Sequence, residues 1–436
     1  MISDFFFACP RCGCRDCVAT RKRKTLCEKC GVDFERMGRA VRVGNTVRPA
    51  YAWFDQIAKA AVPLPTPCEE VPLEPGEQAL AVSEAGTLRQ ANRARPFKGF
   101  LNHRARVEEL QTAGTARVVF TDRRFVLVQG KAFRWWPLEE VRCVTTDARE
   151  FVVKVRNEGV FHIEFPHQSP LWWELVSREI LRRYWALRDR EVIEYQPFLR
   201  FRDQEKLVKV TEPLVPPDTL GLKHPRDHWW REVTYWAVRA VARAVFELFF
   251  ELTLEGREHL PKRGPYILIA NHEGYLDSFF ILAALPVKLG FLAKNTEFDS
   301  AFHRWAMRVF RSVPVHRHRP DPVAVANTLR LLRRGAPVAI FPEGERTWDG
   351  RLLPPKRTTV KLLMRAGVPV VPCRVIGSYD VLPRWDTRMQ KHDVTVRLGP
   401  PFRFDESVAS VEEAIEEIQA RLEALGPGKS AGSPSR

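Results

Sequence analysis

The chain has 436 residues, of which 45% are hydrophobic, so it can form two or three packed domains. Its formal net charge of +16 favours a polyanionic partner, which would be either nucleic acid or an anionic membrane surface. The apolar run at residues 1–7 is too short for a signal peptide and is followed at once by cysteines, so we expect no such leader.

Two pairs of cysteines in the first 38 residues have the spacing of a metal site. Cys9 and Cys12 form one CxxC knuckle, and Cys27 and Cys30 form the other. Four thiolates at this spacing suit one tetrahedral zinc ion, and so short a segment needs a metal to supply its folding energy. Residues 1–38 resemble a zinc ribbon. We expect a closed structural site, whose removal would spare most of the chemistry of the remaining chain.

Two further cysteines leave the ligand set open. Cys14 and Cys17 could bind a second metal ion or replace one of the four ligands, and a redox disulfide is the main alternative to zinc. The spacing is that of metal ligands rather than of a disulfide framework, so we expect a reducing compartment. The basic run at residues 21–24 lies between the knuckles. We interpret it as a solvated loop rather than a contact with nucleic acid.

The next two segments differ in composition and in hydrophobic pattern. Residues 39–75 are predicted to be a linker, because residues 62–75 are rich in proline and should be extended. Short alternating strands separated by turn signals follow within residues 76–200. They are predicted at 115–120, 125–128, 133–136, 141–144, 151–155 and 160–165, with a helix at 171–185. Residues 117–128 resemble bacterial pleckstrin-homology-like and GRAM domains, which implies a small β-barrel with a C-terminal helix.

Residues 226–252 have the pattern of one long amphipathic helix. Charges recur mostly four residues apart and form one polar stripe, which comprises Arg231, Arg239, Arg243, Glu247 and Glu251. These charges exclude a membrane span, which needs about twenty mostly apolar residues. A helix in the membrane interface fits better, with the arginines facing the headgroups and with three tryptophans at its start, Trp229, Trp230 and Trp236. The alternative is a helix packed on the C-terminal domain.

Two short strings hold the residues with catalytic potential. The first is Asn-His-Glu-Gly-Tyr-Leu-Asp at residues 271–277, and the second is Phe-Pro-Glu-Gly-Glu-Arg-Thr at residues 341–347. Moving an acyl group from a thioester to a hydroxyl needs a base, and neutral histidine suits this role because its pKa lies near working pH. A carboxylate on the other ring nitrogen fixes the tautomer and stabilises the imidazolium.

The spacing of His272 and Asp277 constrains the local structure. On a regular helix the two side chains would point about 140° apart, so they can meet only if His272 lies in a loop before a helix. The strand-like run at 265–270 and the helix-compatible run at 278–285 fit that arrangement. The alternative is that Asp277 is only a helix N-cap and His272 an ordinary loop residue.

Together the strings read NHxxxxD and FPEGxR, and they resemble the glycerolipid acyltransferase family, whose members acylate glycerol 3-phosphate or lysophosphatidic acid. The resemblance covers roughly residues 225–405. It implies that His272 is the general base and that Asp277 orients it. The residues of the second string that it assigns to the acceptor pocket are Glu343, Gly344 and Arg346.

Two further blocks extend the resemblance. Residues 311–317 are similar to the second block of the family, which implies that Arg317 binds phosphate, although Arg311 stands where the family usually has glycine. Residues 368–372 are similar to the fourth block. Lys294 occupies a position where relatives place a basic residue near the acceptor phosphate. The replacement of glycine at this position affects the assignment of the acceptor more than the assignment of the reaction.

One more lysine belongs to this comparison. Lys356 matches the lysine of a Phe-Lys-x-Gly stretch, but Thr358 replaces its glycine. Arginine fits phosphate as a planar fork and lysine as a point charge. Taken singly, Lys294, Arg317 and Arg346 would be solvated surface charges, and only their positions inside the blocks give them a role.

The predicted architecture is multidomain. Its parts are a zinc ribbon at 1–38, a linker at 39–75, a PH-like β-barrel at 76–200, an α/β acyltransferase domain at 210–425 and a disordered tail at 426–436. The resemblance implies acyl transfer from acyl-CoA or acyl-carrier protein to a lysophospholipid, most of all 1-acyl-sn-glycerol 3-phosphate. We expect a peripheral protein on the cytoplasmic side of the cell membrane, with structural zinc.

Two alternatives to that function remain. One keeps the enzyme and changes the acceptor to another lysophospholipid or an amine lipid. The other is a membrane or nucleic-acid adaptor built on an inactive acyltransferase fold. The complete set of His272, Asp277, Glu343 and Arg346 argues against the adaptor, because drift would be expected to erase some of these residues.

Overall fold

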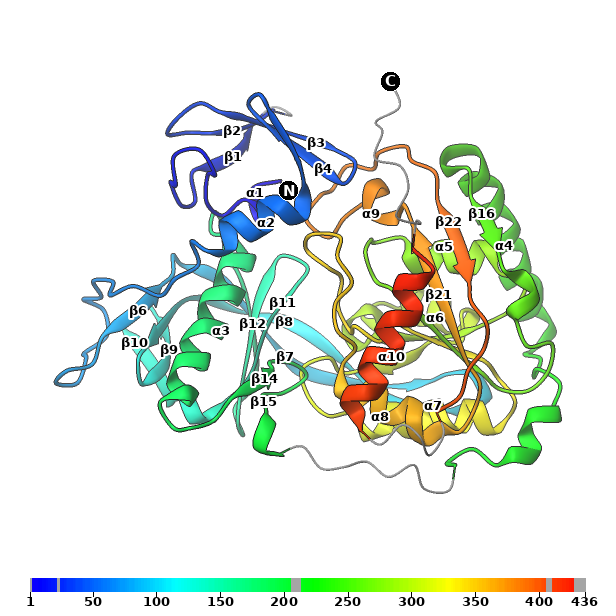
Figure 1. Ribbon diagram of the computed structural model, residues 1–436. Helices are drawn as coiled ribbons and strands as arrows, with labels where there is room; N and C mark the ends of the chain where they lie inside the picture. The colour runs from blue at the N-terminus through cyan, green and yellow to red at the C-terminus, as the bar shows by residue number, and fades with distance from the viewer. Residues whose placement is uncertain (1, 22–23, 205–212, 405–409, 427–436) are drawn as a thin grey trace.

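The computed structural model describes residues 2–21, 24–204, 213–404 and 410–426, and Figure 1 shows three parts within them. A small N-terminal module (blue) lies above a β-rich middle domain (cyan to green) and a larger C-terminal α/β domain (Figure 1). The expected multidomain architecture is confirmed. Two residues of the basic run, Lys22 and Arg23, and the predicted disordered tail beyond residue 426 lie outside the described residues.

The N-terminal module is a five-stranded antiparallel sheet in sequential order. Its elements are α1 (Ile2–Phe5), β1 (Val18–Arg21), β2 (Lys24–Cys27), β3 (Asp33–Met37), β4 (Ala40–Val43), β5 (Thr46–Pro49) and α2 (Ala50–Ala58). The first part of the expected linker at 39–75 is therefore folded, because β4, β5 and α2 complete the module. Trp53 on α2 is buried and donates to the Val41 carbonyl at 2.8 Å. We propose that the module extends to residue 58.

The middle domain is one curled antiparallel sheet, a half-barrel. Its elements are β6 (Ala79–Val82), β7 (Gly86–Lys98), β8 (Arg104–Thr121), β9 (Arg124–Gln129), β10 (Ala132–Pro137), β11 (Val141–Asp147), β12 (Glu150–Val155), β13 (Gly159–Glu164) and α3 (Pro170–Ala186). The main strand order is β10-β9-β8-β7-β13-β12-β11, and β6 pairs with β8. The short strands β14 (Val192–Glu194) and β15 (Arg200–Phe201) follow. The predicted β-rich domain with a C-terminal helix is confirmed.

The strands β7 and β8 form a hairpin much longer than the rest of the half-barrel. They pair from Gly86 opposite Ala116 to Lys98 opposite Arg104. The far part of this hairpin packs on the C-terminal domain, where Phe97 contacts Phe298 edge-to-face at 4.8 Å between ring centroids. The hairpin therefore ties the middle domain to the C-terminal domain.

The C-terminal domain alternates strands and helices. Its strands are β16 (Thr253–Glu255), β17 (Ile267–Ala270), β18 (Gly290–Lys294), β19 (Val313–Val315), β20 (Val338–Ile340), β21 (Val370–Ile376) and β22 (Thr395–Leu398). Its helices are α4 (Trp229–Phe250), α5 (Asp277–Ala284), α6 (Ala301–Val309), α7 (Pro322–Arg333), α8 (Arg357–Ala366), α9 (Ser378–Val381) and α10 (Val411–Ala424). Short 3-10 turns in the chain are Phe100–Asn102, Leu138–Glu140, Arg202–Gln204, Pro217–Gly221, Arg257–His259 and Asn295–Phe298.

The seven strands of this domain lie in the order β16-β22-β21-β17-β20-β18-β19. All neighbouring pairs are parallel except β21 with β22. The central strands are buried on both faces, as their nearly continuous apolar sequences require, and β17 is buried along its whole length. In a parallel sheet the carboxyl ends of the strands share one edge, and ligands bind there.

The helix α4 exposes its apolar face rather than burying it. Trp229, Val233 and Leu248 are 76%, 60% and 72% exposed. Part of the polar stripe turns inward, since Arg239 donates to the Leu285 carbonyl at 2.8 Å at the end of α5, whereas Glu247 and Glu251 are exposed. The expectation that the arginines face headgroups is therefore wrong for Arg239, whose charge satisfies carbonyls that a helix end leaves unpaired. Among helices of the described residues, none combines the length and apolar character that crossing a membrane requires.

Candidate active site

The catalytic candidates lie at the carboxyl ends of four neighbouring parallel strands. His272 follows β17, Glu343 follows β20, and Lys294 ends β18. Arg317 follows β19 at the end of the sheet. Chain reversal after each strand thus brings residues from well-separated strings to one edge of the sheet, as the two sequence strings require.

The loop between β17 and α5 brings His272 and Asp277 together. The His272 Nδ1 atom lies 2.7 Å from Oδ2 of Asp277, which is the first residue of α5 and is fully buried. The same oxygen accepts hydrogen bonds from the backbone amides of Glu273 at 2.8 Å and Gly274 at 3.0 Å. Asp277 is therefore more than a helix cap, because it holds both the loop and the imidazole. With Nδ1 held, Nε2 is the nitrogen that can take a substrate proton.

Two contacts fix the start of this loop. The Asn271 side chain pairs with the backbone of Val375 on β21, accepting at 2.7 Å and donating at 3.0 Å. The His272 ring stacks on Phe341, with 4.1 Å between centroids and 14° between planes. The imidazole thus has little freedom to rotate, which favours a defined direction of proton transfer.

Burial sets the protonation state of His272. It lowers the pKa of His272 from 6.5 to about 4, against the opposing effect of the Asp277 carboxylate, and the positive charges of Arg346 and Arg317 lower it further. The imidazole is therefore neutral near neutral pH, as a general base must be before it reacts.

Glu343 supports the loop from the neighbouring strand. It is buried, and its carboxylate accepts hydrogen bonds from the backbone amides of His272 at 3.2 Å and Leu353 at 3.3 Å. Burial and the nearby Glu273 raise its pKa well above the usual range. Gly344 has a φ of +70°, and a Cβ atom there would lie 3.1 Å from the Lys356 side chain. These two residues therefore shape the site by their backbone contacts.

The three basic candidates have different surroundings. Lys294 forms an ion pair with Asp147 of β11, so the middle domain already neutralises it. The Arg346 guanidinium lies over the Tyr275 ring, 3.5 Å from its centroid. Across the described ranges, the guanidinium of Arg317 has no ion pair or hydrogen bond, and burial lowers its pKa. Arg317 and Arg346 are thus the cations that remain available to an anionic ligand.

A small cavity lies beside this row of residues. It measures about 110 Å³ and is lined by Phe341, Gly344, Arg317 and Lys356 together with Gln196 and Pro197, which follow β14. A second cavity of about 40 Å³ shares Arg317 and adds Lys294 and Glu108, the last from the β7–β8 hairpin. Residues outside the C-terminal domain thus form part of both walls, which the sequence did not predict.

Residues 251–376 match the protein family described as Acyltransferase. This match spans both strings and both members of the His272–Asp277 pair. This part of the chain is an acyltransferase domain. Within it, the imidazole of His272 contacts the Asp277 carboxylate, and the charges of Arg346 and Arg317 act on the same ring.

The acyltransferase domain is distantly homologous to proteins that acylate lysophosphatidic acid. It is 29% identical over 198 residues to 1-acyl-sn-glycerol-3-phosphate acyltransferase BAT2, chloroplastic, of Brassica napus, which covers 44% of this chain and 57% of that protein. It is 30% identical over 181 residues to the chloroplastic LPAT1 enzyme of the same description from Arabidopsis thaliana, covering 40% of this chain and 50% of that protein. The chain thus spans about half the length of the curated relatives it matches.

The 1-acyl-sn-glycerophosphate (LPA) acyltransferase PlsC from Thermotoga maritima is 25% identical, with a TM-score of 0.41, over 48% of this chain and 86% of that chain.

The two departures from the family pattern have structural explanations. Arg311 replaces glycine but keeps a positive φ of 55°, the left-handed region that glycine favours. Its buried guanidinium forms an ion pair with Glu232 of α4 at 2.9 Å and lies over the Phe100 ring. Lys356 pairs with Glu345 at 3.2 Å, and Thr358 lines the larger cavity. Arg311 therefore has a structural role outside the acceptor site.

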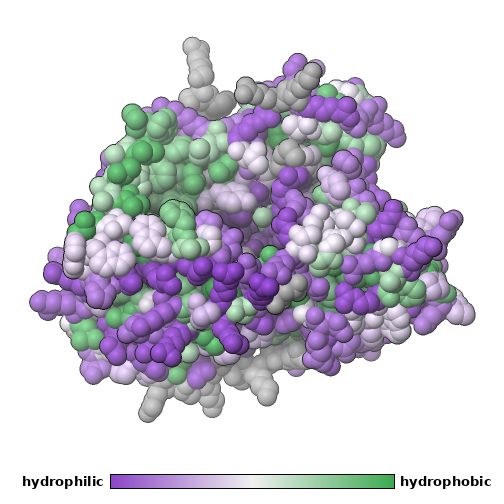
Figure 2. All heavy atoms as spheres, turned by 180° about the vertical axis from the view of Figure 1, so that it is seen from behind, coloured by the Kyte–Doolittle hydropathy of each residue, from purple (hydrophilic) through white to green (hydrophobic). Residues whose placement is uncertain are grey.

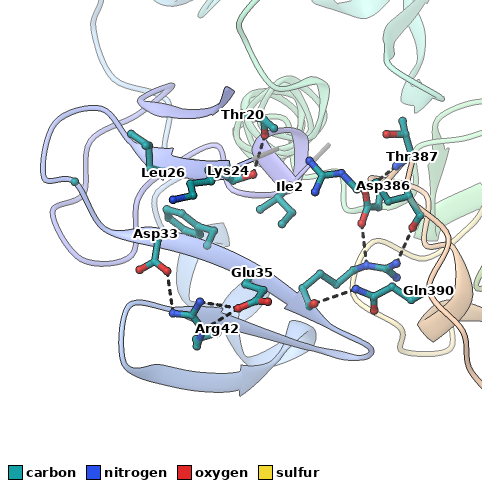
Figure 3. A pocket seen from close by; sticks show the side chains of 15 residues that line it. Ile2, Thr20, Lys24, Leu26, Asp33, Glu35, Arg42, Asp386, Thr387 and Gln390 are labelled. Carbon is teal, nitrogen blue, oxygen red and sulfur yellow. Dashed lines mark hydrogen bonds and ion pairs between the residues drawn. The ribbon is translucent and has the colours of Figure 1, made fainter. Parts of the chain in front are cut away.

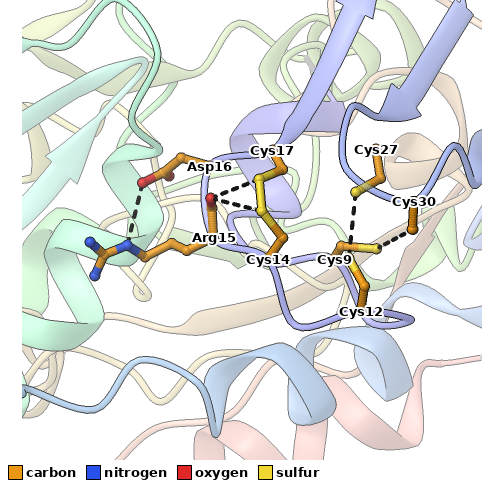
Figure 4. The surroundings of a disulfide bond; sticks show 8 residues. All are labelled: Cys9, Cys12, Cys14, Arg15, Asp16, Cys17, Cys27 and Cys30. Carbon is orange, nitrogen blue, oxygen red and sulfur yellow. Dashed lines mark hydrogen bonds and ion pairs between the residues drawn. A yellow bond between two sulfur atoms is a disulfide. The ribbon is translucent and has the colours of Figure 1, made fainter.

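The four predicted cysteine ligands form a separate cluster in the N-terminal module. The sulfur atoms of Cys9, Cys12, Cys27 and Cys30 all lie within 4.8 Å of one another, with Cys9–Cys30 and Cys12–Cys27 each 3.7 Å apart (Figure 4). Tetrahedral zinc with bonds of about 2.3 Å requires sulfur atoms about 3.8 Å apart, so the cluster fits zinc. Figure 4 shows Cys14 bonded to Cys17 beside this cluster, so neither belongs to it.

We expect one zinc ion per chain in protein purified under reducing conditions, because the four sulfur atoms have the spacing of a closed tetrahedral site. Elemental analysis measures this. A Cys9→Ser, Cys27→Ser variant should lose the metal, whereas a matched Cys14→Ser, Cys17→Ser variant should keep it. Metal-free wild-type protein would contradict the assignment.

The lowered pKa of His272 predicts the acidic side of the pH profile. The base becomes inactive only when it is protonated, so acyl transfer should persist well below pH 6.5, the ordinary value for histidine. The measurement is kcat/KM for the wild-type enzyme from about pH 5 to 8. An acidic limb centred on the ordinary histidine value would show that His272 is not held in a buried, neutral state.

Proposed function

We propose that the chain is an O-acyltransferase that moves a fatty acyl group from acyl-CoA or acyl-carrier protein to the hydroxyl of a lysophospholipid. The proposed acceptor is 1-acyl-sn-glycerol 3-phosphate, and the product is phosphatidic acid. The observation that carries this proposal is the His272–Asp277 pair at 2.7 Å, next to two arginines without carboxylate partners. The proton acceptor and the anion-binding groups are thus adjacent.

The geometry supports a direct transfer. Nε2 of His272 takes the proton of the acceptor hydroxyl as its oxygen attacks the thioester carbonyl. The tetrahedral intermediate then collapses, the carbon–sulfur bond breaks, and the imidazolium returns the proton to the leaving thiolate. Asp277 stabilises the imidazolium while it carries the proton. Arg317 and Arg346 bind the acceptor phosphate.

The experiment that tests the function is an assay of purified protein with labelled acyl-CoA and a panel of lysophospholipids. Lysophosphatidic acid should be acylated fastest. His272→Ala should abolish transfer, and Asp277→Asn should leave a folded protein whose kcat is lower by about a hundredfold or more, because the base loses its orienting carboxylate. A turnover rate close to that of the wild type in the His272→Ala protein would contradict this mechanism.

A second acceptor class has one observation in its favour. The smaller cavity is lined by Glu108, so a carboxylate lies among its basic residues. A carboxylate there suits an acceptor that carries an amine as well as a phosphate. The same panel tests this alternative, since amine-bearing lysolipids would then exceed lysophosphatidic acid in kcat/KM.

Arg317→Ala should raise KM for a phosphate-bearing acceptor at least tenfold and leave KM for the acyl donor within about twofold, because the lost contact is a charge-assisted hydrogen bond. Steady-state kinetics with each substrate varied in turn measures this. Arg311→Ala is the matched control, since that guanidinium is already paired with Glu232. Equal changes in both KM values would show that Arg317 is structural.

We propose that the exposed face of α4 docks the enzyme on an anionic membrane, on the cytoplasmic side of the cell membrane. Figure 2 shows hydrophobic (green) and pale aromatic side chains gathered on the left, where α4 lies in this reversed view. Neighbouring helices also carry exposed aromatic residues, among them Phe279 of α5 and Phe302 of α6. Apolar area and a positive net charge both favour an anionic bilayer.

Val233→Glu with Leu248→Glu should weaken binding to vesicles that contain phosphatidic acid or phosphatidylglycerol by about tenfold or more, because both side chains are exposed on α4. Flotation of the protein with the vesicles measures this. Leu187→Glu, an equally apolar residue that is 84% exposed at the end of α3, is the matched control and should bind normally. Equal binding by all three proteins would exclude α4 as the docking face.

A further inference from the structure

The turn between β3 and β4 carries an arginine whose side chain contacts residues outside the N-terminal module. The guanidinium of Arg39 forms an ion pair with Glu273, the residue that directly follows the catalytic His272. It also lies 3.0 Å from Oδ2 of Asp380 and donates to the Gly350 carbonyl at 3.3 Å. All these partners belong to the C-terminal domain, so the contact joins the N-terminal module to the catalytic loop.

Glu273 is a buried charge that needs such partners. Its side chain is fully buried, and Arg374 of β21 contacts its other carboxylate oxygen at 2.7 Å. Burial raises the pKa of Glu273, and the charges of Arg39 and Arg374 oppose this rise. A buried carboxylate is stable only when it is paired, and two arginines from different parts of the chain together pair with this one.

The backbone of Glu273 connects this ion pair to the chemistry. Its amide donates to Oδ2 of Asp277 at 2.8 Å, the same oxygen that holds His272. The position of the Glu273 side chain thus bears directly on the hydrogen bonds that orient the base.

Specific contacts hold the turn in place. Arg36, which is buried, pairs with Asp386 at 2.8 Å and donates to the Arg388 carbonyl at 2.7 Å. The Gly38 amide donates to the Gln390 side chain at 3.0 Å, and a Cβ atom on Gly38 would lie 2.7 Å from Asp380. Figure 3 shows Asp386 and Gln390 on the C-terminal side of a groove of about 750 Å³, facing the module. The turn therefore packs so closely against the C-terminal domain that a residue larger than glycine would not fit at position 38.

We propose that Arg39 is a positioning residue of the acyltransferase active site, supplied by the N-terminal cysteine module. Its guanidinium completes the neutralisation of Glu273 and so holds the Glu273 amide on Asp277. The module therefore contributes to catalysis through its fold, and the expectation that its removal spares the chemistry is replaced by the opposite one. This inference rests on the proposed function for its kinetic readout.

The loss of Arg39 has a signed electrostatic consequence. Removing Arg39 takes one positive charge from the cluster around Glu273: Glu273 keeps its ion pair with Arg374, and Asp380 loses its pair with Arg39. The loss of a nearby positive charge favours imidazolium, so the pKa of His272 should rise. Replacing Glu273 as well removes one negative charge and should restore the original value.

The test is a double-substitution cycle. Arg39→Gln should lower kcat about tenfold or more, change KM for the acyl donor by less than about twofold, and move the acidic limb of the pH profile upward. Adding Glu273→Gln to Arg39→Gln should recover most of the lost kcat and return the limb to its wild-type position. Arg39→Lys, which keeps the charge but not the planar fork, should retain more kcat than Arg39→Gln and leave the acidic limb at its wild-type position.

Two matched controls separate positioning from folding. Arg42→Gln removes a neighbouring arginine whose ion pairs with described residues lie within the module, with Asp33 at 2.9 Å and Glu35 at 2.6 Å, and it should keep wild-type kcat. Arg36→Gln loosens the seating of the module without touching Glu273. If Arg39 acted only by holding the module in place, Arg36→Gln would reproduce its loss and Glu273→Gln would rescue neither variant.

A readout that needs no activity distinguishes this inference from the proposed function. With 13C-labelled histidine, the His272 resonance is assigned by its absence in His272→Gln, and its titration is followed by NMR. A higher pKa in Arg39→Gln that reverts in the double variant supports the inference even if no lysolipid is acylated. Wild-type titration and kcat in Arg39→Gln, or a kcat loss that Glu273→Gln does not relieve, would overturn it.

Discussion

Oδ2 of Asp277 accepts hydrogen bonds from the His272 ring and from two successive backbone amides, and the geometry of the catalytic loop depends on this one oxygen. Hydrogen bonds to a charged acceptor contribute about 1.5–3 kcal/mol each. Three of them offset much of the conformational entropy of the loop at residues 271–276, at about 1–2 kcal/mol per residue. The loop can therefore hold an imidazole in one orientation although it lies outside the sheet and the helix.

Most of the charged side chains around this oxygen are neutralised by a partner of opposite charge. Glu273 contributes an amide to Asp277 and is itself neutralised by Arg374 and Arg39. On the opposite side of the site, Asp147 of the half-barrel neutralises Lys294. The paired cations come with partners from three parts of the chain, whereas Arg317 and Arg346 have none among the described residues. The site thus separates the charges that build it from the charges that can bind a phosphate.

Local sequence patterns predicted what depends on local geometry. The spacing of His272 and Asp277, with an apolar strand before and a helix after, could be satisfied in only one way, and the structure has it. The alternation of the middle strands predicted the end of β8 and the strands β9 to β13 for the same reason, but it missed β6, β7 and the first part of β8. The four cysteines were recognisable because tetrahedral zinc imposes short, fixed spacings.

The remaining features depend on contacts between distant residues. The far part of the β7–β8 hairpin is rich in arginine and glutamate, so its polar surface gave no sign that it packs on another domain. The period of α4 located its polar stripe but could not tell that part of this stripe faces α5. Arg39 was one arginine among many, and its partner Glu273 lies 234 residues away in the sequence. A signal within the first string did exist, since a glutamate beside a catalytic histidine must be paired if it is buried.

The contact between Arg36 and Arg388 spans 352 residues, and this separation has a consequence for how the enzyme is made. During translation the N-terminal segments leave the ribosome first and fold as units. The module can form its sheet at that stage, but Arg36 and Arg39 then remain exposed to water, because the residues that receive them have not been synthesised. Closing so long a loop also costs chain entropy that only the complete set of contacts offsets. The contacts of Arg36 and Arg39 with the C-terminal domain therefore form only after residues 380–388 have been synthesised.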